Sequence, residues 1–183
     1  MKILGIDPGS TRVGYGLIKA ERGNLKFIRA GLLKINPLRQ SADGGKNLSQ
    51  RLMSLKLKRL LDLEKSFSQL LKKEKPNLVA LEKLYFVKNQ KTALEVGQSR
   101  GVLVLIILKN KLPFIEISPS EAKLIVSGDG QASKKAIAKM VGYYLKIDTT
   151  RQIDDATDAL ALAIAADSIR NNPLKQPPLT LKE

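Results

Sequence analysis

Apolar residues dominate three short runs near the start of the chain, at residues 2–6, 13–19 and 25–35. The first run ends at Asp7-Pro8-Gly9-Ser10, and Arg22-Gly23-Asn24 separates the second run from the third. Glycine, proline, asparagine and aspartate are the residues that interrupt strands and form turns. The pattern therefore predicts a three-stranded antiparallel meander whose first strand is buried and closes in a turn.

A long helical pattern follows. Residues 46–75 contain no glycine or proline, and their apolar side chains recur every three or four positions, which is the spacing of one helix face. Asn47 and Gln50 resemble a capping box at the start of this segment. Pro76 ends it. We therefore predict one long amphipathic helix over these residues.

The segment after Pro76 favours a parallel strand and further helices. Residues 78–81 are continuously apolar and end at Glu82, as is typical of a strand buried on both faces. The remaining pattern predicts a strand at 114–117 and helices at 91–109, 120–126, 133–145 and 154–170. We expect an α/β fold with a mixed five-stranded sheet flanked by helices.

The same pattern predicts the domain organisation. Residues 1–170 are expected to form a single domain, because the chain of 183 residues is long enough for one full core and too short for two. Residues 171–183 are polar and include three prolines. We expect them to form a flexible tail.

The charge of the chain changes this ordinary picture. It has 32 Lys and Arg against 17 Asp and Glu, a formal net charge of +15. Such an excess indicates a polyanionic partner, and nucleic acid is the leading candidate. The basic residues are spread along the chain rather than gathered in a tail, which favours a charged face on a folded domain.

Two absences restrict the chemistry. The chain has no cysteine and no histidine, which excludes disulfides, thiolate or imidazole metal ligands, and any catalytic triad based on histidine. The N-terminal apolar run is too short for a signal peptide, and no stretch has the length of a membrane span. We expect a cytoplasmic protein whose chemistry depends on carboxylates, lysines, hydroxyls and bound metal.

Four acidic residues stand at positions where elements begin or end. Asp7 and Glu82 end two apolar strands. Taken alone, Asp7 is explained equally well as a turn cap, and Glu82 is better explained as a solvated acid where the strand leaves the core. Asp155 and Asp158 share one face in the first turn of the last helix, where the helix dipole alone would favour acids. Residues 159–166 are apolar all round, so this helix must be buried with its acidic end near the strand ends.

Four such acids would repel one another unless cations lay among them. A ligand set made only of oxygen, without histidine or cysteine, selects a hard ion such as Mg²⁺ or Mn²⁺. Two ions about 4 Å apart can clamp a phosphodiester, one activating water and the other stabilising the leaving oxygen. The residues therefore indicate metal-dependent phosphodiester hydrolysis.

Four motifs, taken in order, resemble the RuvC Holliday-junction resolvases of bacteria over residues 1–170. They are the segment 3–9 (Ile-Leu-Gly-Ile-Asp-Pro-Gly), the segment 81–89 together with Gly97-Gln98-Ser99-Arg100-Gly101, the segment Ser118-Pro119-Ser120, and the segment 155–161 (Asp-Ala-Thr-Asp-Ala-Leu-Ala). The resemblance implies a ribonuclease H-like fold, a homodimer, and paired symmetrical Mg²⁺-dependent nicking of a four-way junction. It also implies branch-migration partners of the RuvA and RuvB type.

Carried over position by position, the resemblance assigns the family's catalytic and metal-binding acids to Asp7, Glu82, Asp155 and Asp158. Asp154 is four residues from Asp158, so its contribution stays open. The resemblance also matches Tyr85, with Phe86 beside it, to an aromatic near the crossover, where stacking on an unpaired base is physically reasonable. Lys123 and Lys134 match basic positions close to the phosphate. For all four of these residues, core packing or simple solvation is the plainer interpretation.

Two other functions stay open. Residues 5–11 also resemble the phosphate loop of actin-like ATPases, which enclose the nucleotide between two such domains. A single domain of this size would leave one side of the nucleotide uncovered, which disfavours this function. A DNA-binding protein without catalysis would satisfy the charge, but it has no use for four acids beside its phosphate ligand. Cleavage preferences and the dimer surface are not indicated by the sequence.

Overall fold

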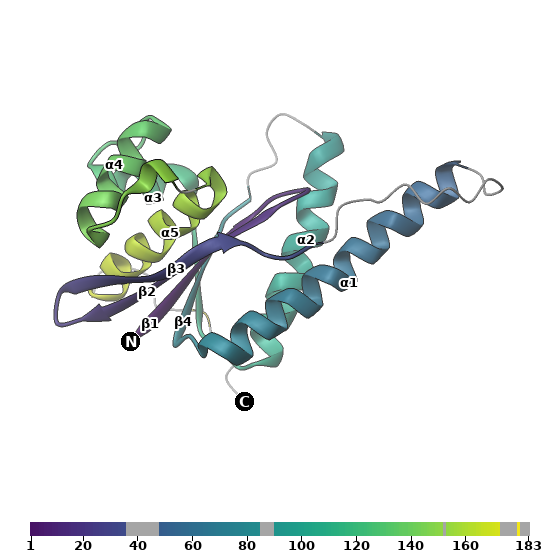
Figure 1. Ribbon diagram of the computed structural model, residues 1–183, viewed down its shortest axis with the longest axis horizontal. Helices are drawn as coiled ribbons and strands as arrows, with labels where there is room; N and C mark the ends of the chain where they lie inside the picture. The colour runs from purple at the N-terminus through teal and green to yellow at the C-terminus, as the bar shows by residue number, and fades with distance from the viewer. Residues whose placement is uncertain (36–47, 85–89, 152, 173–178, 180–183) are drawn as a thin grey trace.

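The computed structural model describes residues 1–35, 48–84, 90–151, 153–172 and 179. Its centre is a five-stranded sheet in the order β3-β2-β1-β4-β5 (Figure 1). The strands are β1 (Lys2–Pro8), β2 (Val13–Glu21), β3 (Asn24–Leu32), β4 (Leu78–Glu82) and β5 (Phe114–Ile117). β1, β2 and β3 pair antiparallel, whereas β4 lies parallel to both β1 and β5. The predicted meander and the mixed five-stranded sheet are confirmed.

Helices cover both faces of this sheet. They are α1 (Leu48–Glu74), α2 (Gln90–Lys109), α3 (Pro119–Ser127), α4 (Lys134–Leu145) and α5 (Asp154–Arg170), with a 3₁₀ turn at Thr149–Arg151. α1 and α2 lie on one face, and α3, α4 and α5 lie on the other (Figure 1). None of the described helices is long and apolar enough to cross a lipid bilayer.

The alternation of side chains along the strands divides the core into two parts. Leu78 and Ala80 of β4 pack into the cluster that contains α3, α4 and α5. Val79 and Leu81 of the same strand pack into the cluster that contains α1 and α2. Because successive strand residues point to opposite faces, a strand covered on both sides must be apolar at every position, which explains the continuous run.

α5 lies unusually close to the sheet. A Cβ atom added to Gly5 of β1 would be 1.8 Å from the carbonyl oxygen of Ala159, and one added to Gly16 of β2 would be 2.6 Å from the amide nitrogen of Leu160. Only glycine allows the helix backbone to approach at these two points. Helix residues 159–166 are buried all round, as their apolar pattern predicted.

The structure corrects several boundaries. β1 continues to Pro8, so Asp7 is part of the strand rather than of a turn after it. α3 begins at Pro119, because Ser118 and Glu121 form a capping box that the sequence interpretation overlooked. The capping box expected at Asn47 and Gln50 lies outside the side chains that the structure describes.

The chain end contacts the sheet at one described residue. Leu179 exchanges two backbone hydrogen bonds with Phe114 of β5, at 2.8 and 3.1 Å. This contact lies on the outer edge of β5, the side away from β4, where no other strand pairs with it among the described residues.

Candidate active site

Asp7 and Glu82 lie side by side at the ends of two parallel strands. Ile6 of β1 is in register with Leu81 of β4, so the next residue of each strand is the acid. The two carboxyl groups are hydrogen-bonded to each other. Such a bond requires a proton on one of them, because two carboxylates have only acceptors. The register of the two parallel strands therefore brings these two acids side by side.

The surroundings of this pair disfavour negative charge. Burial, followed by the charge of Asp7 and the shared hydrogen bond, raises the pKa of Glu82 to about 8. Burial also raises the pKa of Asp7, although the proton donated by Glu82 opposes the shift. Glu82 is therefore the partner that holds the proton in the absence of a further cation.

Asp155 reaches the site because β2 has a glycine beneath it. Gly14 is the antiparallel partner of Asp7, and a Cβ atom added to Gly14 would be 2.0 Å from the carbonyl oxygen of Asp155. The first turn of α5 therefore rests directly on the strand beside Asp7. The carboxylate of Asp155 forms an ion pair with Arg12 in the β1–β2 loop, with Oδ2 and Nε 3.3 Å apart.

Asp158 lies one turn further along the helix and faces α4. Its Oδ2 is 3.6 Å from Nζ of Lys134, the first residue of α4. Burial raises the pKa of Asp158, whereas the ammonium group of Lys134 opposes that shift. The same ammonium group is 3.9 Å from Asp154, whose side chain is 80% exposed. Asp154 therefore lies at the rim of the site, whereas Asp155 and Asp158 lie inside it.

The four predicted acids lie near one another around Asp7, but their side chains are not arranged as the ligands of one metal ion. Asp155 and Asp158 both act electrostatically on Asp7, yet no three acidic side chains among the described residues are grouped tightly enough to hold one ion. Asp155 and Asp158 are instead turned to Arg12 and Lys134. The donor set, partly buried carboxylates that repel each other and are balanced by side-chain cations, fits a hard divalent ion.

The residues predicted to contact DNA lie at different places in the structure. Lys134 lies at the acids, as described above. Lys123 is on α3, where its carbonyl oxygen accepts a hydrogen bond from Ser127, and no ion pair joins its ammonium group to the four acids within the described structure. Tyr85 and Phe86 lie outside the described residues.

Sequence reasoning overlooked two arginines that organise the β1–β2 loop. Arg12 pairs with Asp155, and Arg59 of α1 donates a hydrogen bond to the carbonyl oxygen of Ser10. Nothing near Arg59 in the sequence indicates this contact, because 49 residues separate the partners. Arg12 lies only five residues after Asp7, and this proximity in the sequence is a signal that could have indicated its pairing with an acid of the site.

The sheet order, the helices on both faces and the acids at the strand ends define the class of ribonuclease H-like proteins. The family model "Crossover junction endodeoxyribonuclease RuvC" matches residues 3–166. The curated RuvC of Natranaerobius thermophilus is 38% identical over 164 residues, which cover 90% of this chain and 92% of that protein. The RuvC of Thermosipho melanesiensis is 37% identical over 163 residues, 89% and 94% of the two chains.

The solved structures agree in fold. Thermus thermophilus RuvC superimposes with a TM-score of 0.77 at 22% identity, covering 98% of this chain and 100% of the other. The same protein in complex with a Holliday junction substrate gives a TM-score of 0.77 at 23% identity, with 98% and 99% of the two chains covered. The chain belongs to the RuvC family, as its motifs predicted.

Proposed function

We propose that this chain is a structure-selective endonuclease that resolves four-way DNA junctions by paired, symmetrical, metal-dependent cuts during recombination and repair. Membership of the RuvC family supports the activity. The observation that carries the chemistry is the adjacency of Asp7 and Glu82 at the ends of two parallel strands, with Asp155 and Asp158 above them on α5. The bacterial relatives support action in the cytoplasm, where the chromosome is.

Asp7, Glu82, Asp155 and Asp158 would hold the metal, with Mg²⁺ as the expected ion and Mn²⁺ as a substitute. A bound pair of such ions supplies an activated water and a stabilised leaving oxygen. The chain's own contributions are positional. Asp7 and Glu82 are held rigid by the strands, and the ammonium group of Lys134 is placed where it can balance phosphate charge once the acids turn to the metal.

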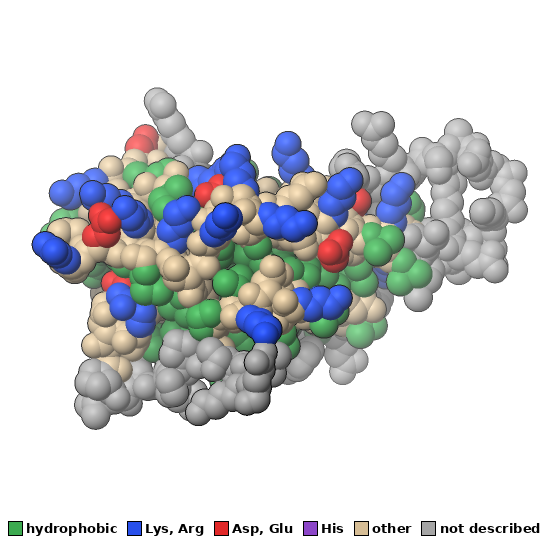
Figure 2. All heavy atoms as spheres, turned by 90° about the horizontal axis from the view of Figure 1, so that it is seen from below, with side chains coloured by type: hydrophobic (Ala, Val, Ile, Leu, Met, Phe, Trp, Pro, Cys, Tyr) green, Lys and Arg blue, Asp and Glu red, His purple; other side chains and the backbone are tan. Residues whose placement is uncertain are grey.

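The surface charge supports a DNA substrate. Figure 2 shows a face on which Lys and Arg side chains outnumber acidic ones and extend from one end of the described structure towards the other. The net charge of the chain is +15. Affinity for a junction should therefore fall steeply with added salt, because each neutralised phosphate releases counterions.

An apolar stripe on α2 supports a homodimer. Leu94 and Leu105 are 67% and 53% exposed, and Gly97 and Gly101 lie between them at the spacing of one helix face. No atom lies within 4 Å of a Cβ added at either glycine, so the glycines leave space on the outer surface. A second copy packed along this stripe would provide the two active sites that paired nicking needs. Branch-migration proteins of the RuvA and RuvB type are the further partners that we propose.

The substitution Asp7→Asn tests this function. The variant should bind a synthetic four-way junction with the affinity of the unaltered protein in the absence of metal, yet lose Mg²⁺-dependent nicking by at least a hundredfold. Glu64→Gln removes an exposed carboxylate on α1 and serves as the matched control. Cleavage that survives Asp7→Asn would contradict the assignment, as would equal cleavage of linear duplex by the unaltered protein.

A further inference from the structure

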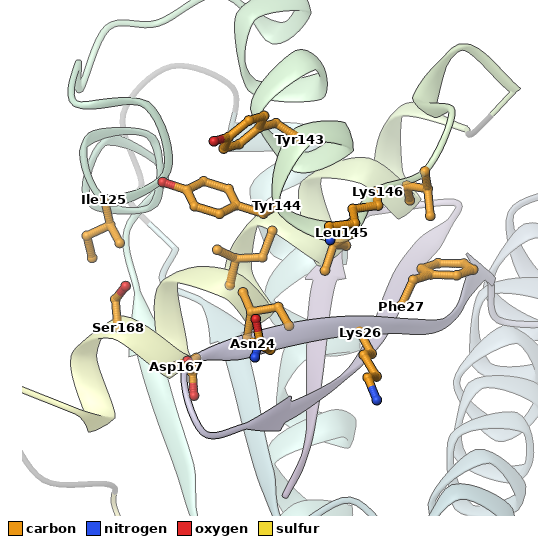
Figure 3. Close-up of a pocket in the computed structure, with 14 residues that line it drawn as sticks. Asn24, Lys26, Phe27, Ile125, Tyr143, Tyr144, Leu145, Lys146, Asp167 and Ser168 are labelled. Carbon is orange, nitrogen blue, oxygen red and sulfur yellow. The ribbon is translucent and has the colours of Figure 1, made fainter.

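A hollow lies at the opposite end of the sheet from the four acids. It has a volume of about 1030 Å³ and lies between the β2–β3 hairpin, the end of α4 and the end of α5 (Figure 3). We call it the hairpin groove, defined by residues 23–27, Ile125, 143–147, Ile164, Asp167 and Ser168.

The hairpin groove is separate from the active site. α4 has 12 residues; its first residue, Lys134, contacts Asp158, and its last, Leu145, lines the groove. At 1.5 Å per residue the two ends of the helix are roughly 16 Å apart. A molecule in the groove therefore leaves the acids free for DNA.

Aromatic and aliphatic side chains dominate the groove. Tyr143 is 75% exposed and Tyr144 is 38% exposed, with their rings edge to face at 5.9 Å between centroids. In Figure 3 Tyr144 projects from α4 over the space between α3, α5 and the hairpin, and Phe27 closes the other end. Exposed tyrosines beside an apolar hollow are typical of protein-binding surfaces.

Two acidic side chains near the groove, Glu21 and Asp167, are already paired with basic side chains, which leaves positive charge in excess around the groove. Glu21 is already paired with Lys19 at 2.5 Å and Lys26 at 3.5 Å. The carboxylate of Asp167 is buried and paired with Arg170 at 2.7 Å.

The segment after α4 adds to this excess. Asp148 accepts hydrogen bonds from Thr150. Lys146 lines the groove, is exposed, and forms no ion pair within the described part of the chain. An acidic group on the bound molecule would therefore complement the positive charge of Lys146 at the rim of the groove.

We propose that the hairpin groove binds a short segment of another protein, in which apolar side chains fill the hollow and flanking acidic side chains face Lys146. DNA is the poorer fit, because its backbone needs several cations in a row and the groove is mainly apolar. A small polar ligand is also a poorer fit, since Asn24 and Ser168 are exposed rather than converging inside the hollow.

Peptide selection tests the proposal without prior choice of a partner. A phage-displayed library of random twelve-residue peptides is selected on the immobilised full chain and depleted on the variant Tyr143→Ala/Tyr144→Ala/Lys146→Glu. Enriched peptides should combine aromatic or aliphatic residues with Asp or Glu. Labelled synthetic copies should bind the unaltered protein and lose at least tenfold in affinity for the triple variant by fluorescence anisotropy.

The controls keep this result specific. Lys139→Glu makes the same charge change on α4 outside the groove and should leave peptide affinity unchanged. The triple variant should retain its circular dichroism spectrum and its junction nicking, so failure here is distinguishable from failure of the nuclease proposal.

Three outcomes would overturn the inference. The first is a selection that yields no peptide able to distinguish the two proteins. The second is binding of a twenty-residue oligothymidine that the triple variant loses and that competes with the selected peptides. The third is a change in oligomeric state of the triple variant by light scattering, which would assign the groove to a second copy of the chain.

Discussion

The carboxyl groups of Asp7 and Glu82 share one proton across two adjacent parallel strands. This relationship makes the stability of the metal-free protein depend on pH. The pKa of Glu82 is about 8 in the folded chain, against an ordinary value of 4.5. Between these values the folded state binds more protons than the unfolded state, so raising the pH favours unfolding.

We expect the free energy of unfolding of the metal-free protein to fall as the pH rises from about 5 to 8. Glu82→Gln keeps a donor toward Asp7 and removes the titration, so it should flatten this part of the profile. Urea unfolding in EDTA at several pH values measures the difference between the two proteins. Glu64→Gln is the control and should follow the unaltered chain. A parallel decline in Glu82→Gln would show that other groups cause the pH dependence.

Arg12 is expected to compete with a bound metal ion for Asp155. The ion pair is exposed on the arginine side, and such pairs contribute roughly 0.2–1 kcal/mol. Arg12→Gln should therefore raise the affinity for Mn²⁺ in the absence of DNA by about 1.4- to 5-fold, measured by isothermal titration calorimetry. Arg22→Gln, at the distant hairpin, should have no effect. A fall in Mn²⁺ affinity would mean that Arg12 holds Asp155 in its binding position instead.

Gly14 allows α5 to approach the strand beside Asp7. In Gly14→Ala the new methyl group would meet the carbonyl oxygen of Asp155 at 2.0 Å, and this backbone atom has to move. Overpacking of this kind costs about 1–3 kcal/mol, which lowers the melting temperature by roughly 2–12 °C in a chain of this size. Nicking should fall as well, because Asp155 shifts with the backbone.

Gly31→Ala is the matched control for this substitution. Its methyl group would lie 3.4 Å from the hydroxyl of Tyr15, a contact that needs little adjustment. Scanning calorimetry and a junction-cleavage assay compare the two variants. Equal melting temperatures and rates for Gly14→Ala and Gly31→Ala would refute the role given to the close approach of α5.

The stripe on α2 is the proposed dimer surface. Leu105→Lys places a charge on one of its two exposed leucines and should convert the dimer to a monomer in sedimentation experiments at micromolar concentration. Leu124→Lys is the control, since Leu124 on α3 is similarly exposed, at 55% against 53%. The proposal fails if Leu105→Lys leaves the protein dimeric or if the unaltered protein is already monomeric.

The sequence by itself determined the elements and most of their order. Strand and helix periods, turn residues and the uniformly apolar runs at 78–81 and 159–166 are local properties, and they were enough to predict the sheet and the buried last helix. They were also enough to place Asp7 and Glu82 at strand ends. Local pattern is informative here because burial on both sides leaves no position for a polar residue.

Only the tertiary structure decided what surrounds those acids. The steric need for Gly14 depends on Asp155, 141 positions later in the chain, and the partner of Asp158 is at the start of another helix. The hairpin groove likewise combines residues 23–27 with residues 143–147. Such relationships arise from how folded elements approach one another, and no periodicity along the chain encodes them.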